Sequence, residues 1–271
     1  MDTFTITQPS HSTAFLGALS TDALQQRVPS AFAPSAHESR SPSYTFISTA
    51  RVVDALGLAG FYPVEARQAM RARSVLHARH LIRFRRRFET VALRDAVPEI
   101  LFLNSHDGTS AYQLRVGLYR AICTNGLVVS EGTFPVFRVA HRGDVVADVV
   151  AAALRIAERF EVLAASVERM ERTRLDQLQR LDFAAQAATL RFREGPTSGV
   201  EPGRLLVPRR AQDAGDDLWR TFNVVQENLL RGGIPRRSAT HRLRRTRGIT
   251  AIREDVRLNS GLWDLALARA A

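Results

Sequence analysis

The chain has 271 residues, of which 45% are hydrophobic, and a formal net charge of +11. This length allows one sizeable packed core, and the positive charge predicts a long-range attraction to polyanions that salt weakens. A single cysteine, Cys123, excludes an internal disulfide framework and any zinc site built from several cysteines. The sequence has no run of about 18 apolar residues and no secretory pattern at its amino terminus, so we expect a soluble, cytoplasmic protein without a membrane partner.

Composition divides the chain into a tail and a single domain. Residues 1–41 are rich in Ser, Thr, Pro, Ala and Gln, and prolines interrupt any periodicity, which is typical of a disordered tail that contributes nothing to the core. Residues 42–271 show the alternating and helical hydrophobic patterns of a folded domain. We predict an α+β fold in which an antiparallel curved sheet, within residues 42–141, is packed by the long helices of residues 144–271.

The domain is expected to begin with a short strand at Tyr44–Ile47, followed by a helix. Ser48 or Thr49 can cap this helix, because a hydroxyl oxygen accepts from the free backbone N–H groups of the first turn. Gly57 and Gly60 would bring the helix to its end.

All 38 basic residues are arginine, and two short tracts hold many of them. Eight lie within residues 67–87 and seven within residues 231–247. A guanidinium group matches phosphate with a rigid set of donors and stacks on bases, so clustered arginines favour nucleic acid as a partner. A GC-rich genome also encodes arginine readily, so the positions of the arginines carry more weight than the absence of lysine.

The first tract contains a segment with a period of two. In residues 79–89 the apolar side chains Ile82, Phe84 and Phe88 alternate with arginines, as in a strand with one dry face. A solvated outer face that happens to be basic is one interpretation. Like charges on one strand face repel one another unless anions or carboxylates cover them, and only Glu89 is near in sequence, so we interpret the stripe as a nucleic-acid track. Its members are Arg79, Arg83, Arg85 and Arg87.

The next segments predict a β-hairpin. Glu99–Leu103 reads as a strand, Asn104–Ser110 as a turn built around Asp-Gly, and Tyr112–Ile122 as the returning strand. On the returning strand Arg115 and Tyr119 lie opposite the apolar side chains. If the strands are neighbours, these two residues would extend the arginine stripe.

From Asp144 the chain is expected to be helical for about 30 residues. Apolar residues recur every seven positions, which is typical of a seam that needs a partner helix. Its members are Val146, Val149, Ala153, Ile156, Phe160, Leu163, Val167 and Met170. A second helix of the same chain, from about Asp182, can cover this seam, and a homo-oligomer is the alternative.

The second arginine tract lies in a predicted basic loop, Pro235–Gly248. A helix over Asp216–Arg231 precedes it and Gly232-Gly233 would end that helix, while an amphipathic helix with Leu258–Leu267 follows. A disordered surface loop is one interpretation, but uniformly basic loops generally meet phosphate. We therefore expect a basic arm that contacts nucleic acid through Arg236, Arg237, Arg242, Arg244, Arg245 and Arg247, with His241 among them.

Three consecutive polar residues, Gln226-Glu227-Asn228, occur within the helix before the arm. At about 100° per residue they cannot all face solvent, so at least one should turn inward. It would bond either the Asn104–Ser110 turn or a ligand, or it would form a buried polar bond that fixes the helix on the sheet. The candidate pocket consists of Asn104, His106, Asp107, Gln226, Glu227 and Asn228.

No catalytic residues, metal site or cofactor are predicted. His106-Asp107 with Ser105 or Ser110 has the residue types of nucleophile machinery, but adjacent side chains on a turn diverge, and turn chemistry of Asn104 and Asp107 is the simpler account. No cysteine or carboxylate cluster accompanies the histidines at positions 77, 80, 106 and 141. No glycine-rich phosphate loop occurs either, which disfavours nucleotide hydrolysis.

Several separated motifs resemble a family found on prophages and plasmids and catalogued as domain of unknown function 932. They are Leu103–Tyr112, Cys123–Leu127, Trp219, Asn223, Gln226–Asn228, Gly232-Gly233, and Leu258-Asn259 with Leu262-Trp263. The resemblance covers about residues 42–267. It implies an origin in a mobile genetic element and no agreed activity.

A second resemblance concerns architecture. A helix that ends at Ala59-Gly60-Phe61, followed by basic antiparallel strands and then by long helices, is similar to the core of single-strand annealing proteins, in which a curved sheet and a helix enclose a cationic groove.

We therefore expect a nucleic-acid-binding protein of a mobile element, with single-stranded DNA favoured, that acts by binding or annealing in recombination or replication. The competing hypothesis is a protein-interaction module, such as an inhibitor of a host defence or replication factor, that uses the heptad surface of residues 145–170. An enzyme acting on nucleic acid is a third hypothesis, which requires His106, Asp107, Glu227 and Asn228 to converge in a cleft.

Overall fold

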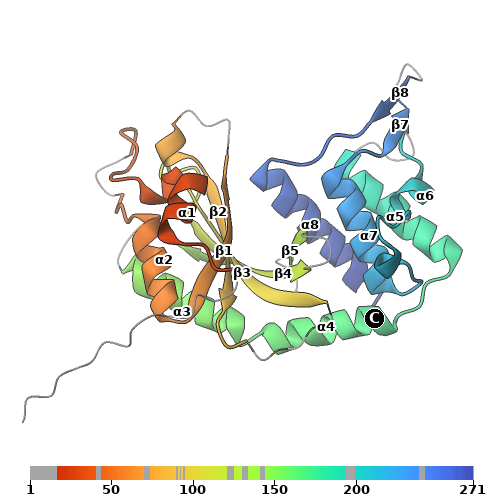
Figure 1. Cartoon of the computed structure of the whole chain (residues 1–271), viewed down its shortest axis with the longest axis horizontal. Helices are drawn as coiled ribbons and strands as arrows, with labels where there is room; N and C mark the ends of the chain where they lie inside the picture. Colours follow the sequence, from red (N-terminus) through yellow and green to blue (C-terminus); the bar gives the residue numbers. More distant parts are fainter. Residues whose placement is uncertain are drawn as a thin grey trace, which may run out of the picture.

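The computed structural model describes residues 17–40, 44–69, 74–89, 91, 93, 95–120, 125–129, 134–140, 144–192, 199–237 and 242–270. Cys123, His141 and His241 lie outside these residues, as does the side chain of Arg237. The predicted α+β class is confirmed, with an antiparallel sheet packed by helices (Figure 1).

The main sheet is a six-stranded antiparallel sheet in the order β1-β2-β3-β4-β5, with β6 also pairing with β4. Its strands are β1 (Phe61–Gln68), β2 (His80–Arg86), β3 (Ala96–Asn104), β4 (Tyr112–Arg120), β5 (Asn125–Val128) and β6 (Phe137–Val139). The predicted hairpin is therefore confirmed as β3 and β4, joined by a turn in which Gly108 has a φ of 74°. A positive φ is strained for residues other than glycine, which explains the Asp-Gly pair at this position.

Alternation along the strands gives the sheet two different faces. On one face Phe84, Phe102 and Leu114 join the main hydrophobic core. On the other face Leu81, Leu101 and Leu103 form a smaller apolar cluster with Ile252 and Val256 of α8. Figure 1 shows α1, α2 and α3 on the first side of the sheet and α7 and α8 on the other; their bounds are α1 (Thr21–Arg27), α2 (Thr49–Leu58), α3 (Val145–Ala157), α7 (Leu218–Arg231) and α8 (Ile252–Leu267).

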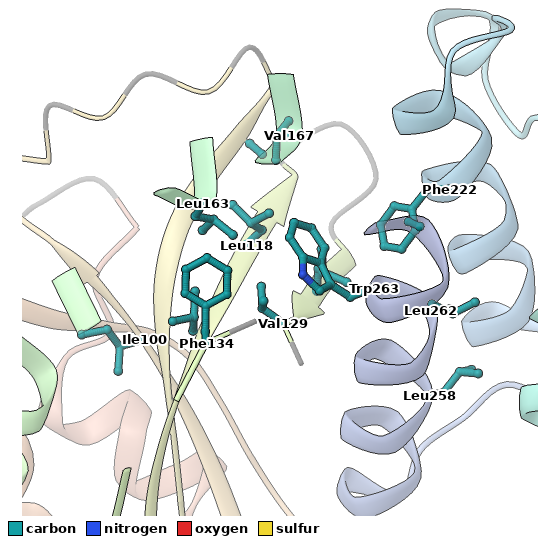
Figure 2. Close-up of a cluster of buried hydrophobic side chains, with 14 of the residues drawn as sticks. Ile100, Leu118, Val129, Phe134, Leu163, Val167, Phe222, Leu258, Leu262 and Trp263 are labelled. Atoms are coloured by element: carbon teal, nitrogen blue, oxygen red, sulfur yellow. The ribbon is translucent and has the colours of Figure 1, made fainter. Parts of the chain in front are cut away.

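The helical half of the chain packs on the sheet through aromatic side chains. Trp263 of α8 lies between the sheet and Phe222 of α7, and the two rings meet edge to face with centroids 6.2 Å apart (Figure 2). Leu118 of the sheet and Leu163 of α4 belong to the same core as these rings, so sheet and helices share one hydrophobic interior. The remaining helices of this half are α4 (Phe160–Arg172), α5 (Gln177–Phe192) and α6 (Pro202–Leu205).

The expectation that residues 1–41 contribute nothing to the core is wrong for residues 17–40. α1 and the following 3-10 helix (Pro29–Phe32) place Leu24, Val28 and Ala31 in the core with at most 2% exposure each. Ser20 caps α1 by accepting a hydrogen bond from the Ala23 N–H at 3.2 Å. Composition did not reveal this segment, because only a few of its residues are apolar. These residues, on short helical turns, are enough to join the core when they pack against the sheet and α2.

The first residues of the predicted domain also differ from expectation. Tyr44–Ile47 does not form a strand, although the Tyr112 hydroxyl donates to the Ile47 carbonyl at 2.7 Å and holds the segment against β4. Ser48 is confirmed as the cap of α2, since its side chain accepts from the Ala50 N–H at 3.3 Å.

The heptad seam is used inside the protein. The long helix predicted from Asp144 is divided into α3 and α4, and the Asp144 side chain caps α3 by accepting from the Ala147 N–H at 3.2 Å. Val149, Ile156, Leu163 and Met170 are all 0% exposed. Packing within the chain, rather than a coiled coil between copies, therefore covers this apolar surface.

The basic loop has a regular structure that the sequence pattern did not predict. β7 (Pro235–Arg237) and β8 (Leu243–Arg245) pair as an antiparallel two-stranded ribbon. As predicted, α7 ends at Gly232, whose φ is 69°, and Gly233 also has a positive φ of 80°. Figure 1 shows the ribbon projecting from the helical half of the molecule.

Burial of the amino-terminal segment can be tested by truncating one core side chain. Leu24→Ala should lower the free energy of unfolding by about 2–5 kcal/mol, because it leaves a cavity in a packed interior. Chemical denaturation followed by circular dichroism measures this difference. Leu178→Ala, at a side chain that is 77% exposed, is the matched control and should change the stability by less than about 0.5 kcal/mol. Equal effects of the two substitutions would show that residues 17–40 do not belong to the core.

Candidate nucleic-acid interface

The predicted arginine stripe is divided by the limits of β2. Arg79 precedes the strand and Arg87 follows it. Of the four arginines predicted in the stripe, Arg83 and Arg85 therefore remain within β2, on the face that packs against α8. Arg83 is 1% exposed, and Arg85 also lies largely within the protein, with a side chain that is 18% exposed. Neither side chain can therefore serve as part of an open track.

Carboxylates from neighbouring strands neutralise these two arginines. The Arg83 Nη1 donates to Glu99 Oε2 at 2.9 Å, and Arg83 Nε lies 3.3 Å from Glu65 Oε2. Glu99 also accepts from Arg85 Nε at 2.8 Å, and its side chain is 0% exposed. Arg83 and Arg85 therefore do not form an open arginine stripe, because acids that are distant in sequence lie over them.

The environment of Arg83 holds its positive charge firmly. Burial would lower the pKa of Arg83, but the charges of Glu99 and Glu65 outweigh burial and raise it above its ordinary value. Gly126 of β5 lies directly beside the guanidinium, and a Cβ atom at this position would overlap it. A side chain at position 126 would therefore displace the Arg83 guanidinium, which reaches across the sheet face to β5, the strand paired with β4.

The same charged face connects the sheet to the helices. Arg67 of β1 pairs with Asp255 of α8, and Asp255 also accepts from the Asn259 side chain one turn along that helix. Gln226 of α7 donates to Asn259 Oδ1 at 2.7 Å. Because Arg67 Nε also lies 3.9 Å from Glu65 Oε1, a chain of ion pairs and hydrogen bonds runs from Arg85 at the sheet to α7 and holds α8 on the strands.

Glu99, the shared partner of Arg83 and Arg85, is the residue of this network whose substitution should lower the stability of the protein most. Glu99→Gln would leave a buried guanidinium without its main counter-charge and should lower the free energy of unfolding by about 3–5 kcal/mol. Glu168→Gln, which breaks the exposed ion pair of Glu168 with Arg172, is the control and should cost less than about 1 kcal/mol. Urea denaturation of the two variants distinguishes these values, and a loss at position 99 no larger than the control would contradict the assigned ion pair.

The two motifs of the candidate pocket have separate hydrogen-bond partners in the described structure. Asn104 donates to Thr49 Oγ1 at 3.2 Å, and His106 Nε2 lies 3.2 Å from the same hydroxyl. Asp107 accepts from the Thr109 N–H at 2.9 Å, which confirms the predicted hydrogen bond to a local backbone amide. The same prediction for Asn104 is wrong, because its side chain bonds Thr49 instead.

The second motif is held among the helices and loops of the other half. Gln226 bonds Asn259, Glu227 pairs with Arg210 and with Arg231, and Asn228 donates to the carbonyls of Leu205 and Val207 at 2.9 Å each. All three residues of the motif are buried. The prediction that this motif turns inward is confirmed, and its bonds fix α7 in place.

In the described ranges the hydrogen bonds of Asn104 and Asp107 go to Thr49 and Thr109, and those of the α7 motif go to residues of the helical half. An enzyme acting on nucleic acid required these residues to converge, and that hypothesis loses its geometric basis. Among the side chains that the structure describes, no three His, Cys, Asp or Glu residues are grouped as metal ligands.

Sequence reasoning missed a second buried ion network at the other end of β3. Arg120 pairs with Asp95 and also, at 3.0 Å, with Asp213. Asp95 accepts from Trp219 Nε1 at 3.1 Å, and Asp213 accepts from Arg210 Nε at 2.9 Å. These partners are separated by up to 124 positions, so no local pattern could have indicated them.

A buried histidine organises the end of the sheet near the amino-terminal segment. His80 Nδ1 lies 3.1 Å from the Ala78 carbonyl, which can only accept, so Nδ1 carries a proton and shares it with Ser30 Oγ at 2.9 Å. His80 Nε2 then accepts from the Thr49 hydroxyl at 3.0 Å. Burial lowers the pKa of His80 from 6.5 to about 4, and the bond to Ala78 offsets this only in part.

This pKa predicts an acid-dependent loss of stability. Because the unfolded chain takes up a proton near pH 6.5 and the folded chain only near pH 4, stability is constant above pH 6.5 and falls between the two values. The loss should reach about 2 kcal/mol at pH 5 and about 3 kcal/mol below pH 4. Unfolding free energies of wild type at pH 7, 6 and 5 should show this slope, and His80→Gln should remove it. His37→Gln, outside this network, should retain the slope, and an unchanged slope in His80→Gln would overturn the assignment.

The predicted residues that do gather on the surface are those of the β7–β8 ribbon. Arg242, Arg244, Arg245 and Arg247 are exposed, and Arg236 is half-buried opposite Arg244. Within the described ranges, Arg244, Arg245 and Arg247 have no carboxylate as an ion-pair partner; Arg245 Nη1 instead donates to the Gly233 carbonyl at 2.9 Å. These three arginines therefore keep their positive charge at the surface.

The base of the ribbon is anchored to α5. Arg191 donates to the backbone carbonyls of Leu229 and Arg247, which join the end of α7 to the end of the ribbon. Burial lowers the pKa of Arg191, and repulsion by Arg236 lowers it further. Attraction to Glu254 acts in the opposite direction but does not outweigh these effects. The Phe192 ring lies 5.1 Å from the Arg191 guanidinium and 5.3 Å from that of Arg236.

A cavity of about 570 Å³ opens between the ribbon and α5. Its walls combine five arginines with one aromatic ring and one hydroxyl. The lining residues are Arg191, Phe192, Arg236, Arg244, Arg245, Thr246 and Arg247. Guanidinium groups around an aromatic ring are the chemistry that binds phosphates and bases.

The other predicted contacts are dispersed. Arg87 lies beside the Tyr62 and Phe88 rings, at 5.9 Å and 5.4 Å from their centroids. Tyr119 is occupied by Arg85, whose guanidinium lies 4.2 Å from the centre of its ring. Arg79 and Arg115 line a different cavity beside α8. The structure therefore gathers the ribbon arginines but not the residues predicted on the sheet.

The described part of the chain is thus an α+β protein with an ion-paired, buried sheet face and an exposed arginine ribbon. The chain belongs to the family described as "Domain of unknown function (DUF932)", whose model matches residues 36–263. The resemblance found in the sequence is confirmed. None of the helices in the described ranges combines the length and apolar character needed to cross a bilayer.

Two curated relatives come from Escherichia coli strain K12. The UPF0380 protein YfjQ is 40% identical over 250 residues, which cover 92% of this chain and 90% of the relative. The UPF0380 protein YafZ is 40% identical over 253 residues, which cover 92% of this chain and 91% of the relative. No solved structure matches the chain significantly.

Proposed function

We propose that the protein binds nucleic acid and that the β7–β8 ribbon is its principal contact. The observation that carries this proposal is the exposed charge of Arg244, Arg245 and Arg247 on a projecting two-stranded ribbon, for which the described ranges show no ion-paired carboxylate. Arginines that are buried in the interior are ion-paired with carboxylates, as Arg83 is. Arginines left exposed in a cluster fit an external polyanion instead.

The form of the ribbon favours a duplex. The major groove of B-DNA, about 12 Å wide, admits a two-stranded β-ribbon, whose exposed arginines then reach phosphates and base edges. The expectation of a single-stranded partner depended on an arginine stripe along the sheet, and its central members are buried. An origin in a mobile genetic element belongs to the same proposal and is supported by the family resemblance. A role in recombination or replication is supported by the architectural similarity to single-strand annealing proteins.

The competing protein-interaction hypothesis has lost its surface. It required an exposed apolar seam along residues 145–170, but the seam residues of α3 and α4 are packed in the core. Because the seam is buried, we base the proposal on the exposed, positively charged arginine ribbon instead.

Binding can be measured as a function of salt with matched single- and double-stranded oligonucleotides. For wild type, affinity should fall by orders of magnitude between about 50 and 200 mM salt if several phosphates are contacted. In Arg244→Gln/Arg245→Gln/Arg247→Gln the slope of log affinity against log salt should decrease by about 2–3, because each lost phosphate contact removes about 0.9. The duplex should bind more tightly than the single strand.

A charge-matched control is available on α3 and α4, which lie away from the ribbon (Figure 1). Arg155→Gln/Arg169→Gln/Arg172→Gln removes the same charge from exposed positions of α3 and α4 and should leave the salt slope nearly unchanged. Equal losses in the two triple variants would indicate only a net-charge effect. Affinity that is insensitive to salt would also contradict the proposal.

A further inference from the structure

We infer that the cavity between the β7–β8 ribbon and α5 binds one unpaired nucleotide of the nucleic acid that the ribbon contacts, an assignment that rests on the proposed function. The cavity has a volume of about 570 Å³, which lies within the range of small-molecule sites. A base inside a duplex is covered by its pairing partner and its stacked neighbours, so only an unpaired or extruded nucleotide can enter such a space. The expected ligand is therefore a duplex that continues into a single strand beside the ribbon.

The ribbon presents one of its faces to the end of α5. Arg236 of β7 and Arg244 of β8 are directly paired, so their side chains lie on the same face of the ribbon, and both line the cavity. The Arg236 guanidinium lies 5.3 Å from the centre of the Phe192 ring, at the end of α5. Arg245 and Arg247 are exposed and also line the cavity, so the cavity is continuous with the surface proposed to contact a duplex.

The ribbon segment cannot neutralise its own arginines. From Asn228 to Arg253 the sequence contains no Asp or Glu. Within the described ranges, Arg244, Arg245 and Arg247 have no carboxylate as an ion-pair partner. Like charges held side by side repel one another, and a phosphate group between them would remove that repulsion.

Arg191, at the base of the ribbon, also favours an anion in the cavity. The backbone carbonyls that accept its hydrogen bonds are neutral. Burial and the repulsion by Arg236 lower the pKa of Arg191 despite the attraction of Glu254. A phosphate group beside Arg191 would stabilise its charged form.

Phe192 and Thr246 supply groups suited to a base and a sugar. Phe192 is half-buried, and bases stack on aromatic rings and on guanidinium planes with little dependence on sequence. The Thr246 hydroxyl accepts from the Ile234 N–H at 3.1 Å, and its own hydrogen can be donated to a base or a sugar. The cavity thus combines an aromatic ring for stacking with positive charge for phosphate, as sites that hold single strands do.

Fluorescence anisotropy of the full chain with DNA duplexes of equal paired length tests this assignment. One duplex is blunt, one carries a short single-stranded extension, and one carries an extension of the same length made of abasic nucleotides. We expect the base-containing extension to increase the affinity by about fivefold or more over the blunt duplex, because stacking of a single base contributes that much. The abasic extension carries the same phosphates and should give little of this gain.

The role of the ring can be tested with a matched pair of variants. Phe192→Leu keeps an apolar side chain but removes the ring, and it should reduce the gain from the base-containing extension to about twofold or less. Phe88→Leu is the control and should retain the full gain, because Phe88 also lies beside an arginine but is 81% exposed and does not line the cavity. A fluorescent base analogue at the first unpaired position should change its emission on binding to wild type and to Phe88→Leu, but not to Phe192→Leu. Thermal unfolding confirms that both variants are folded.

The outcomes separate this assignment from the proposed function. Arg244→Gln/Arg245→Gln/Arg247→Gln should lower the affinity for every one of these duplexes, as the proposed function requires. Equal affinities of wild type for the blunt and the extended duplex would overturn the assignment of the cavity and leave the ribbon contact intact. An equal gain from the abasic extension, or equal gains in Phe192→Leu and Phe88→Leu, would overturn it as well. Absence of binding to any of the oligonucleotides would contradict both proposals.

Discussion

The buried ion pairs of Arg83 and Glu99 are the constraint on which the arrangement of sheet and helices depends. A guanidinium removed from water is tolerated only when counter-charges and hydrogen bonds replace its hydration. Glu99 meets this requirement for both Arg83 and Arg85, which fixes the relation of β2 to β3. The same requirement applies to Arg67, whose ion pair with Asp255 holds α8 against the sheet. A polar face thus acts as a specific docking surface, and apolar packing around Leu101 and Trp263 supplies the bulk of the burial.

This constraint also decides where positive charge remains available. The chain has a net charge of +11, but arginines of the packed face are matched by acids. Positive charge without an ion-paired carboxylate in the described ranges is left on Arg244, Arg245 and Arg247 of the β7–β8 ribbon. Helix α8 contributes both to the apolar packing and to the ion network, so both interactions hold it on the sheet.

The polar motifs that carry the family resemblance make hydrogen bonds and ion pairs that hold elements of the fold together. Gln226, Glu227 and Asn228 each satisfy partners on a different element, and Asn104 joins Thr49 at the opposite end of β3 from Asp95. Buried polar groups need a defined partner and geometry, whereas apolar residues tolerate exchange of similar shapes. Polar residues at such positions are therefore recognisable in sequence even when they have no direct role in binding.

The sequence by itself determined the features that depend on local spacing. Alternation predicted β2, β3 and β4, Ser48 and Asp144 predicted helix caps, Asp-Gly predicted the hairpin turn, and the basic composition of residues 235–248 predicted the exposed charge. Only the tertiary structure decided which arginines are free to meet a ligand, because Arg67 finds its acid 188 positions away and Arg83 finds Glu99 only through strand pairing. Likewise, α1 enters the core only because a sheet and α2 are there to cover it. Local periodicity specifies the direction of a side chain, but its burial and its charge partner are set by elements that folding brings together.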